Sequence, residues 1–274
     1  MSDQQNNNLE VKFEPKSAVS IFDAPLSWVA LFGSLIGAFS VIPMSFYTSG
    51  GGFMSAGMGI FAPVAGMILG PWAGFIAGSI GGLIGLMILP SAYPMGLLDV
   101  VLSGSIMPLC WGFFIPKYYK WLLVIFPINA AIYLIVPYYY PGYRIGLSPP
   151  IEPYYALSRH AAILSIFVFF LFCKKFMRMV ESPIVKTHIT GIVGITYLAN
   201  AMWVAPWSWP YTLLYRIPLE PSYVTAYLGW FNHTIPIVAA TTTIGYFLMN
   251  ALRKGKLKVV KDSWLDGYNL QVPI

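Results

Sequence analysis

The chain has little charge. Asp, Glu, Lys and Arg make up only 9% of its 274 residues, against roughly 25% in an ordinary soluble domain. Hydrophobic residues make up 57%, and this composition excludes a soluble globular domain. Several apolar segments reach the ~20 residues needed to cross a hydrocarbon core of about 30 Å. The sequence therefore predicts that nearly the whole chain is one integral membrane domain.

Cysteine and recognisable catalytic motifs are also scarce. Cys110 and Cys173 lie inside apolar segments without CxxC spacing, so neither a disulfide framework nor a zinc site is indicated. No GxxxxGK[ST] motif is present, so any ATP hydrolysis must come from a partner. No nucleic-acid-binding motif surrounds the basic residues. We expect a protein that is not an enzyme, has no cofactor and binds no nucleic acid.

Apolar runs separated by Pro, Gly and charged breaks predict an all-α, polytopic transmembrane helix bundle with about eight spans. The second and third spans are separated only by Gly70 and Pro71, and they form either a tight helical hairpin or one kinked, re-entrant element. We expect an N-terminal tail over residues 1–24, a transmembrane domain over 25–250 and a basic tail over 251–274. The predicted spans are residues 25–44, 53–69, 72–89, 96–115, 119–137, 157–174, 187–206 and 224–250.

Basic residues are distributed unevenly between the predicted loops. With a cytoplasmic N-terminus, 13 of the 16 Lys and Arg residues fall on the inner side, and only Arg144, Arg159 and Arg216 fall on the outer side. This positive-inside bias appears only if the number of crossings is even. We therefore expect a multi-pass protein of the plasma membrane with both termini in the cytoplasm.

Small residues recur at four-residue steps in the first three apolar segments. Residues four apart share one face of a helix, and small faces let helix backbones approach closely in lipid. These faces either pack against each other inside the fold or dock on a partner subunit. The rows are Ala30, Ser34 and Ala38; Gly33 and Gly37; Gly66, Gly70, Gly74, Gly78 and Gly82; and Ala77, Gly81 and Gly85.

The stretch AGMILGPWAG, residues 65–74, ends one apolar segment and leads into a Gly/Ala-rich one. Residues 53–89 thereby resemble the substrate-binding S components of energy-coupling factor (ECF) transporters, in which a pattern like (A)GxxLGPxxG precedes such a helix. The matching residues are Ala65, Gly66, Leu69, Gly70, Pro71 and Gly74.

The first helix of that family carries an AxxxA-type motif that contacts the transmembrane coupling subunit. The resemblance implies that this chain docks on such a subunit, and through it on ATPase subunits. Because S components typically have fewer helices than this chain, ligand residues are not carried over from the family. The implied docking residues are Ala30, Ser34, Ala38, Gly74, Gly78 and Gly82.

Polar side chains within the apolar segments gather at one predicted depth. Such side chains are costly inside a membrane, and they often mark binding sites or pathways. They fall in the outer leaflet, beneath loops rich in Tyr, Trp and Pro that form either interfacial belts or a lid. We predict an outward-facing pocket for a small nutrient such as a vitamin. Its residues are Asp99, Arg159, His160, Asn200, Trp203, Asn232 and His233.

Each of these residues also has a purely structural interpretation. In the pocket, Asp99 accepts hydrogen bonds or pairs with a cation, and Arg159 holds an anionic group. In the structural interpretation, Asp99 and Arg159 pair with each other or lie among lipid headgroups. His160 and Asn200 contact the solute or only bridge helices. Aromatic rings nearby in the sequence are suited to stack on a heteroaromatic solute or to face a cation. They are Trp203, Trp207, Tyr227 and Trp230.

Two further polar residues are placed outside the predicted pocket. Asn129, in the fifth apolar segment, is expected to hydrogen-bond between helices. His188 lies near the cytoplasmic end of the seventh segment and is expected at the membrane interface. Neither residue is assigned a part in binding.

Three other functions stay open from the sequence. His160 and His233 are placed to be axial ligands of a b-type haem in a redox membrane anchor. Together with Asp99 they alternatively form a site for a transition metal. The chain is alternatively a structural subunit of a larger membrane complex, in which the small faces are permanent interfaces. Membrane lipids and other membrane subunits are expected partners in every case.

Overall fold

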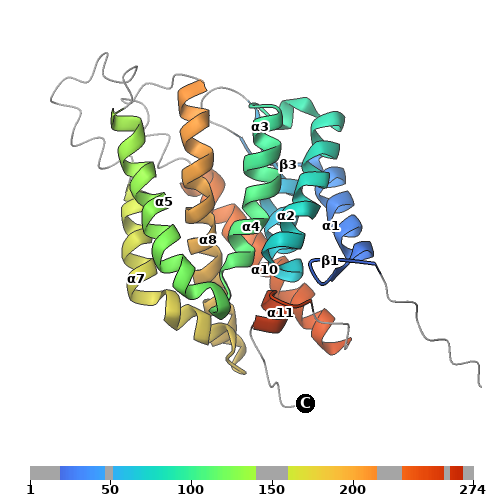
Figure 1. Cartoon of the computed structure of the whole chain (residues 1–274), viewed down its shortest axis with the longest axis vertical. Coiled ribbons are helices and arrows are strands. Elements are labelled where there is room, and N and C mark those ends of the chain that lie inside the picture. The colour runs from blue at the N-terminus through green and yellow to red at the C-terminus, as the bar shows by residue number, and fades with distance from the viewer. Residues whose placement is uncertain (1–18, 47–51, 140–159, 215–229, 256–259, 268–274) are drawn as a thin grey trace, which may run out of the picture.

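A computed structural model describes residues 19–46, 52–139, 160–214, 230–255 and 260–267 of the chain (Figure 1). The described part is a bundle of helices that lie side by side, with two small antiparallel hairpins attached. The first hairpin pairs β1 (Ser20–Ile21) with β2 (Ala24–Pro25), and the second pairs β3 (Pro43–Phe46) with β4 (Phe53–Ser55). The predicted all-α helix bundle is confirmed at this level.

Every predicted apolar segment contains a helix. Three α-helices are preceded by π-helical turns, and short 3₁₀ turns lie between other helices. The α-helices are α1 (Leu26–Ala38), α2 (Ala62–Ile88), α3 (Leu97–Asp99), α4 (Ile106–Phe113), α5 (Tyr119–Tyr139), α7 (His160–Val180), α8 (Val185–Leu214), α10 (Ile235–Lys254) and α11 (Trp264–Gly267). The π turns are η2 (Gly57–Phe61), η4 (Val100–Ser105) and η8 (Trp230–Thr234), and the 3₁₀ turns are η1 (Phe39–Val41), η3 (Pro90–Ala92) and η5 (Pro116–Tyr118).

Length and hydropathy single out a few candidate membrane spans. Within the described residues, Gly57–Ile88 and Asn232–Lys254 are each long and apolar enough to cross a membrane. A third candidate arises if Leu97–Phe113 and Pro116–Ile132, which meet at an angle of 91°, count as one broken span. These helices indicate association with a membrane. The eight crossings and the cytoplasmic termini stay predictions.

Gly70 divides α2 into two arms, residues 62–69 and 71–88, that fold back on each other. Its φ of 79° and ψ of 177° are not helical, and such a positive φ is readily adopted only by glycine. A Cβ atom on Gly74 would lie 2.9 Å from the Cα atom of Gly66, whereas residues eight apart in a straight helix are separated by about 12 Å. The chain therefore forms the tight hairpin. Gly57–Ile88 consists of two arms joined at Gly70 and is not one straight helix.

The second arm of α2 is held between α1 and the η4–α4 segment by glycine contacts. A Cβ atom on Gly81 would lie 2.7 Å from the carbonyl oxygen of Gly33 in α1. One on Gly78 would lie 1.8 Å from the carbonyl oxygen of Gly104 in η4. Both glycine rows of this arm are therefore occupied by neighbouring helices of the same chain.

The three glycines that are predicted to dock on a partner, Gly74, Gly78 and Gly82, pack inside the chain instead. All three residues are buried in the chain. Gly74 faces the first arm of α2, Gly78 faces Gly104, and a Cβ atom on Gly82 would lie 3.0 Å from a methyl group of Val100. The small residues serve close packing within the fold, because a glycine face offers the same advantage to an internal neighbour as to a partner.

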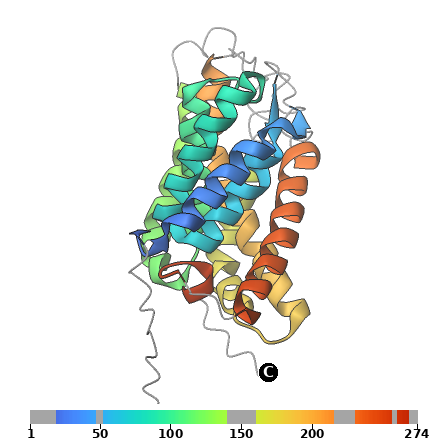
Figure 2. The same cartoon turned by 90° about the vertical axis from the view of Figure 1, so that its right-hand side faces the viewer.

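The row of small residues on α1 lies on the outside of the fold. Ala30, Ser34 and Ala38 are exposed, while Gly33 and Gly37, on the adjoining ridge, are buried against α2. Figure 2 shows α1, in blue, on the outside of the bundle. One ridge of α1 therefore attaches it to the fold, and the other stays accessible.

The end of the bundle opposite α3 is covered by residues 260–267. Trp264 is buried and its Nε1–H donates a hydrogen bond to the carbonyl oxygen of Trp111 at 2.9 Å. Arg253 Nη2 donates to the carbonyl oxygen of Trp264 at 3.2 Å. Lys117 pairs with Asp262, and this carboxylate raises the pKa of the Lys117 ammonium group. Part of the predicted basic tail is thus packed against the helices.

Candidate functional site at the α3 end of the bundle

Two of the π turns near the α3 end are bound by side chains from other helices. Trp203 Nε1–H, on α8, donates to the carbonyl oxygen of Leu102 in η4 at 2.8 Å. Thr241 Oγ1–H, on α10, donates to the carbonyl oxygen of Gly59 in η2 at 3.1 Å. A π turn disturbs the regular ladder of backbone hydrogen bonds, and such turns are frequent at functional sites. These contacts place α8 beside η4 and α10 beside η2.

Asp99 is a buried carboxylate at the end of α3, with 1% of its surface exposed. Its Oδ1 atom accepts a hydrogen bond from Trp207 Nε1–H at 2.8 Å, and its Oδ2 atom accepts one from the backbone N–H of Met95 at 2.7 Å. Within the described residues, Lys117 and Asp262 form the one ion pair, so no basic side chain there neutralises Asp99. A buried charge without a countercharge is costly. Asp99 is therefore suited to receive a proton or a cationic group.

Trp203, Trp207, Tyr211 and His233, here named the aromatic cluster, lie against one another beside Asp99. The His233 ring is stacked on Trp203, with centroids 5.7 Å apart, and on Trp207, at 6.4 Å. Trp207 is in turn stacked on Tyr211 at 4.8 Å. The three residues from α8 recur at four-residue steps, so they share one face of that helix. His233 Nδ1 also hydrogen-bonds Ser45 Oγ of β3 at 2.9 Å.

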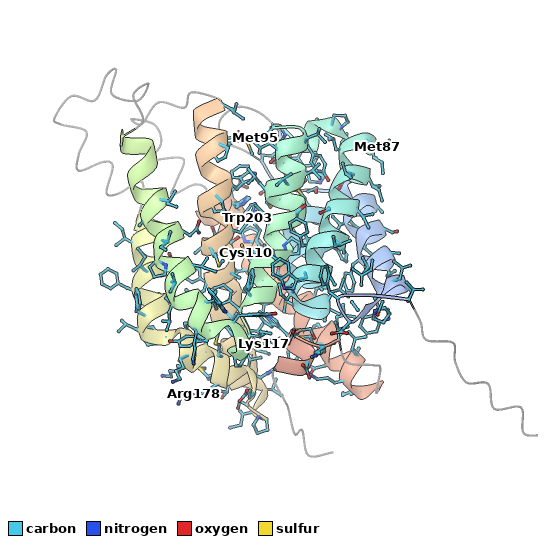
Figure 3. All side chains as sticks on the ribbon, viewed as in Figure 1. Met87, Met95, Cys110, Lys117, Arg178 and Trp203 are labelled. Carbon is cyan, nitrogen blue, oxygen red and sulfur yellow. The ribbon has the colours of Figure 1, made fainter. Side chains whose placement is uncertain are left out.

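Asn200 and Asn232 border the aromatic cluster and connect it to its surroundings. Asn200 Nδ2–H donates to Thr234 Oγ1 at 3.4 Å, which joins α8 to the start of α10. Asn232 Nδ2–H donates to the carbonyl oxygen of Phe46 at 2.7 Å. Figure 3 shows Met95 at the α3 end, Trp203 deeper in the bundle and Lys117 at the opposite end.

The structure brings five of the predicted pocket residues into one region. Two others cannot be placed in it. Arg159 lies outside the described residues, as does Tyr227 of the nearby aromatic residues. His160 begins α7, but its side chain is not described. The five are Asp99, Asn200, Trp203, Asn232 and His233, and their binding of a solute stays a prediction.

Two important members of the site were missed by sequence reasoning. Trp207 was noted only as a nearby ring, yet it donates directly to Asp99. Its spacing of four residues from Trp203 was a signal that both indoles share one helix face. Ser45 binds His233 across 188 positions of sequence, and no local pattern marks it.

The structural interpretation is confirmed for Asn129, whereas the place of His188 at the membrane interface stays a prediction. Asn129 Nδ2–H donates to the carbonyl oxygen of Met202 at 2.7 Å, and so bridges α5 and α8 as expected. The His188 side chain is buried among the helices: it is 4% exposed, and its Nδ1–H donates to the carbonyl oxygen of Val180 at 2.6 Å. Cys110 and Cys173 are free and buried.

The described residues give little support to the haem and transition-metal interpretations. No group of three or more His, Cys, Asp or Glu side chains within them is arranged to hold a metal ion. His233 packs against the rings of Trp203 and Trp207, which also contact each other with centroids 5.8 Å apart. The haem interpretation also requires His160, and the structure describes only the backbone of this residue.

A small pocket of about 140 Å³ lies at the opposite end of the bundle and contains none of the predicted residues. It is formed where the turn after β1, the hairpin of α2 and the C-terminal segment meet. Its charged and aromatic lining residues are Phe22, Asp23, Trp72, Tyr118, Lys261 and Asp262.

Comparison with known proteins identifies no relative of this chain. No protein-family model matches it, and neither a curated protein nor a solved structure does. Its function is therefore inferred from its own residues.

Proposed function

We propose that the chain is the solute-binding membrane subunit of a transporter, similar in role to the S component of an ECF transporter. The observation that carries this proposal is the buried Asp99 carboxylate, hydrogen-bonded by Trp207 beside the aromatic cluster. A buried acid next to stacked rings combines a polar anchor with apolar walls, which is how small-molecule sites are generally built. The subunit captures a small nutrient, such as a vitamin, at the α3 end.

The distribution of charge supports an outward-facing site. Lys117 and Arg178 lie at the end opposite α3 (Figure 3), and Arg253 contacts the C-terminal segment at that same end. Basic residues favour the cytoplasmic side of a membrane. In this orientation Asp99 and the aromatic cluster lie in the outer half of the bundle, with both termini in the cytoplasm and eight crossings between them.

The exposed ridge of α1 supports docking on a coupling subunit. Ala30, Ser34 and Ala38 carry small side chains at four-residue steps and face away from the fold. Helices associate in lipid mainly through close van der Waals contact, which such ridges permit. Because the chain has no nucleotide-binding motif, the coupling subunit and its ATPases supply the energy.

We expect Ser34→Leu to release the coupling subunit. The added side chain stands in the middle of the exposed ridge and keeps a partner backbone at a distance, while the fold of the chain is unchanged. Native mass spectrometry of the gently extracted complex measures retained subunits and small molecules together. The wild-type protein is expected to carry both a partner and a solute.

The matched control is Thr243→Leu, which places the same side chain on an exposed position of α10. The control should retain the partner. Equal retention in Ser34→Leu and Thr243→Leu would contradict docking through α1. A wild-type complex that retains partner subunits and never a small molecule would favour a structural subunit instead.

A further inference from the structure

A line of buried polar atoms without hydrogen-bond partners runs between α8 and α10. Thr196 Oγ1 and Asn200 Oδ1 belong to α8, and Thr242 Oγ1 belongs to α10. Their residues are 0%, 1% and 5% exposed, respectively. His188 Nε2 and Arg253 Nη1 are further buried atoms without a partner on the same two helices. We name these five residues the polar track.

Contacts between the two helices place the polar track in their interface. The ring of His188 lies 5.5 Å from that of Tyr246 near one end of the interface. Asn200 bonds Thr234 near the other end. The two helices are therefore antiparallel, and positions 188, 196 and 200 fall within one sector of α8, as positions 242, 246 and 253 do on α10.

The two ends of the polar track meet polar groups of different kinds. Towards the α3 end, Asn200 adjoins Thr234, which follows His233 of the aromatic cluster. At the opposite end the interface contains the titratable groups of His188, Tyr246 and Arg253, and Arg253 interacts electrostatically with His188. The residues between these ends are neutral hydroxyl and amide side chains.

Unpaired polar atoms at this density are unusual in a packed interior. Each hydroxyl or amide buried without a hydrogen bond costs about 1–3 kcal/mol, and the large majority of such groups in proteins bond to protein or to ordered water. Because Asn200 donates through Nδ2 and lacks a partner at Oδ1, exchanging the two amide atoms would leave the other unpaired. Ordered water is the usual partner of such groups when no protein group reaches them.

We propose that the polar track binds a file of waters that forms a proton path between the cytoplasmic end of the bundle and the site beside His233. Each water in such a file accepts a proton on one side and releases another on the opposite side, so one O–H bond forms as one breaks. No oxidant or reductant takes part. His188 Nε2 is a proton acceptor at the inner end, because Nδ1–H is held by the carbonyl oxygen of Val180. This inference takes the orientation of the bundle from the proposed function, but it needs no solute.

The test is proton flux into liposomes that contain the full chain and an entrapped pH-sensitive dye. Wild-type protein is expected to acidify the lumen faster than protein-free liposomes under an imposed pH gradient. The double variant Thr196→Val and Thr242→Val removes two hydroxyl groups and keeps their shape. We expect it to slow the flux about tenfold, which corresponds to a barrier higher by about 1.4 kcal/mol.

Two exposed threonines on the same helices provide the matched control. Thr190, on α8, and Thr243, on α10, each bond the carbonyl oxygen four residues earlier and are exposed. The double variant Thr190→Val and Thr243→Val should conduct as the wild type does. Equal flux in the two double variants, or wild-type flux equal to that of protein-free liposomes, overturns the proposal.

Thermal unfolding in detergent gives a second readout that does not depend on reconstitution. If waters occupy the track, Thr196→Val with Thr242→Val removes their partners, and the melting temperature falls relative to the exposed control. In a dry interface the same change removes two unpaired hydroxyl groups. A rise in melting temperature therefore overturns the proposal.

Discussion

Replacing Gly78 with alanine is expected to prevent the bundle from assembling. The new Cβ atom would lie 1.8 Å from the carbonyl oxygen of Gly104 and 2.7 Å from a ring carbon of Pro108. The nearest obstacle is backbone, so a side-chain rotation cannot remove the clash. Overpacking of a core typically costs about 1–3 kcal/mol and occasionally more, and we expect a loss at or above the upper end. Size-exclusion chromatography in detergent should show loss of the monodisperse peak.

Gly82→Ala is the graded control for this prediction. Gly82 lies one turn later on the same ridge, but a Cβ atom there first meets a methyl group of Val100, at 3.0 Å. A side-chain methyl can shift by a few tenths of an ångström, so Gly82→Ala should lower the melting temperature without preventing assembly. Equal behaviour of the two variants would show that the contact with Gly104 does not hold these helices together.

Asp99→Asn is expected to abolish retention of the solute. The substitution removes the negative charge and keeps an oxygen that can accept from Trp207. Loss of one partner from a buried, hydrogen-bonded charge pair costs about 2–5 kcal/mol, and 2 kcal/mol already corresponds to roughly 30-fold in affinity. Native mass spectrometry of the extracted complex measures the fraction of protein that carries a small molecule.

Asp23→Asn neutralises an exposed carboxylate at the opposite end of the bundle and serves as the control. It should retain the solute as the wild type does. If Asp99→Asn and Asp23→Asn carry equal amounts of solute, the site does not bind through Asp99. Trp207→Phe keeps the charge of Asp99 and removes the indole N–H together with part of the ring, so it tests the hydrogen bond and the stacking without changing the charge. We expect it to weaken retention less than Asp99→Asn does.

The approximate places of the helices could be predicted from local features of the sequence. Apolar runs must be helical to satisfy their backbone in lipid, and Pro, Gly and charged residues end them. The common depth of Asp99, Asn200 and His233 followed from their positions within those runs. The structure places these residues together, because positions at one depth on neighbouring helices lie close in a bundle.

The assignment of the glycine rows could not be predicted in the same way. Gly78 and Ser34 belong to rows with the same spacing and similar size. One faces Gly104 inside the chain, and the other faces outward. The difference depends on which helix lies next to each row, and a repeat of small residues carries no information about its neighbour.

The amino-acid sequence by itself determined that the chain forms a bundle of apolar helices with polar groups gathered towards one end, because hydropathy and helix-breaking residues act over a few turns. Only the tertiary structure decided that α2 reverses at Gly70, that Trp207 binds Asp99 and that α8 and α10 share a line of unpaired polar atoms. The last two of these features join residues far apart in the chain. They depend on which face of each helix packs against its neighbours. The packing of the whole bundle decides this.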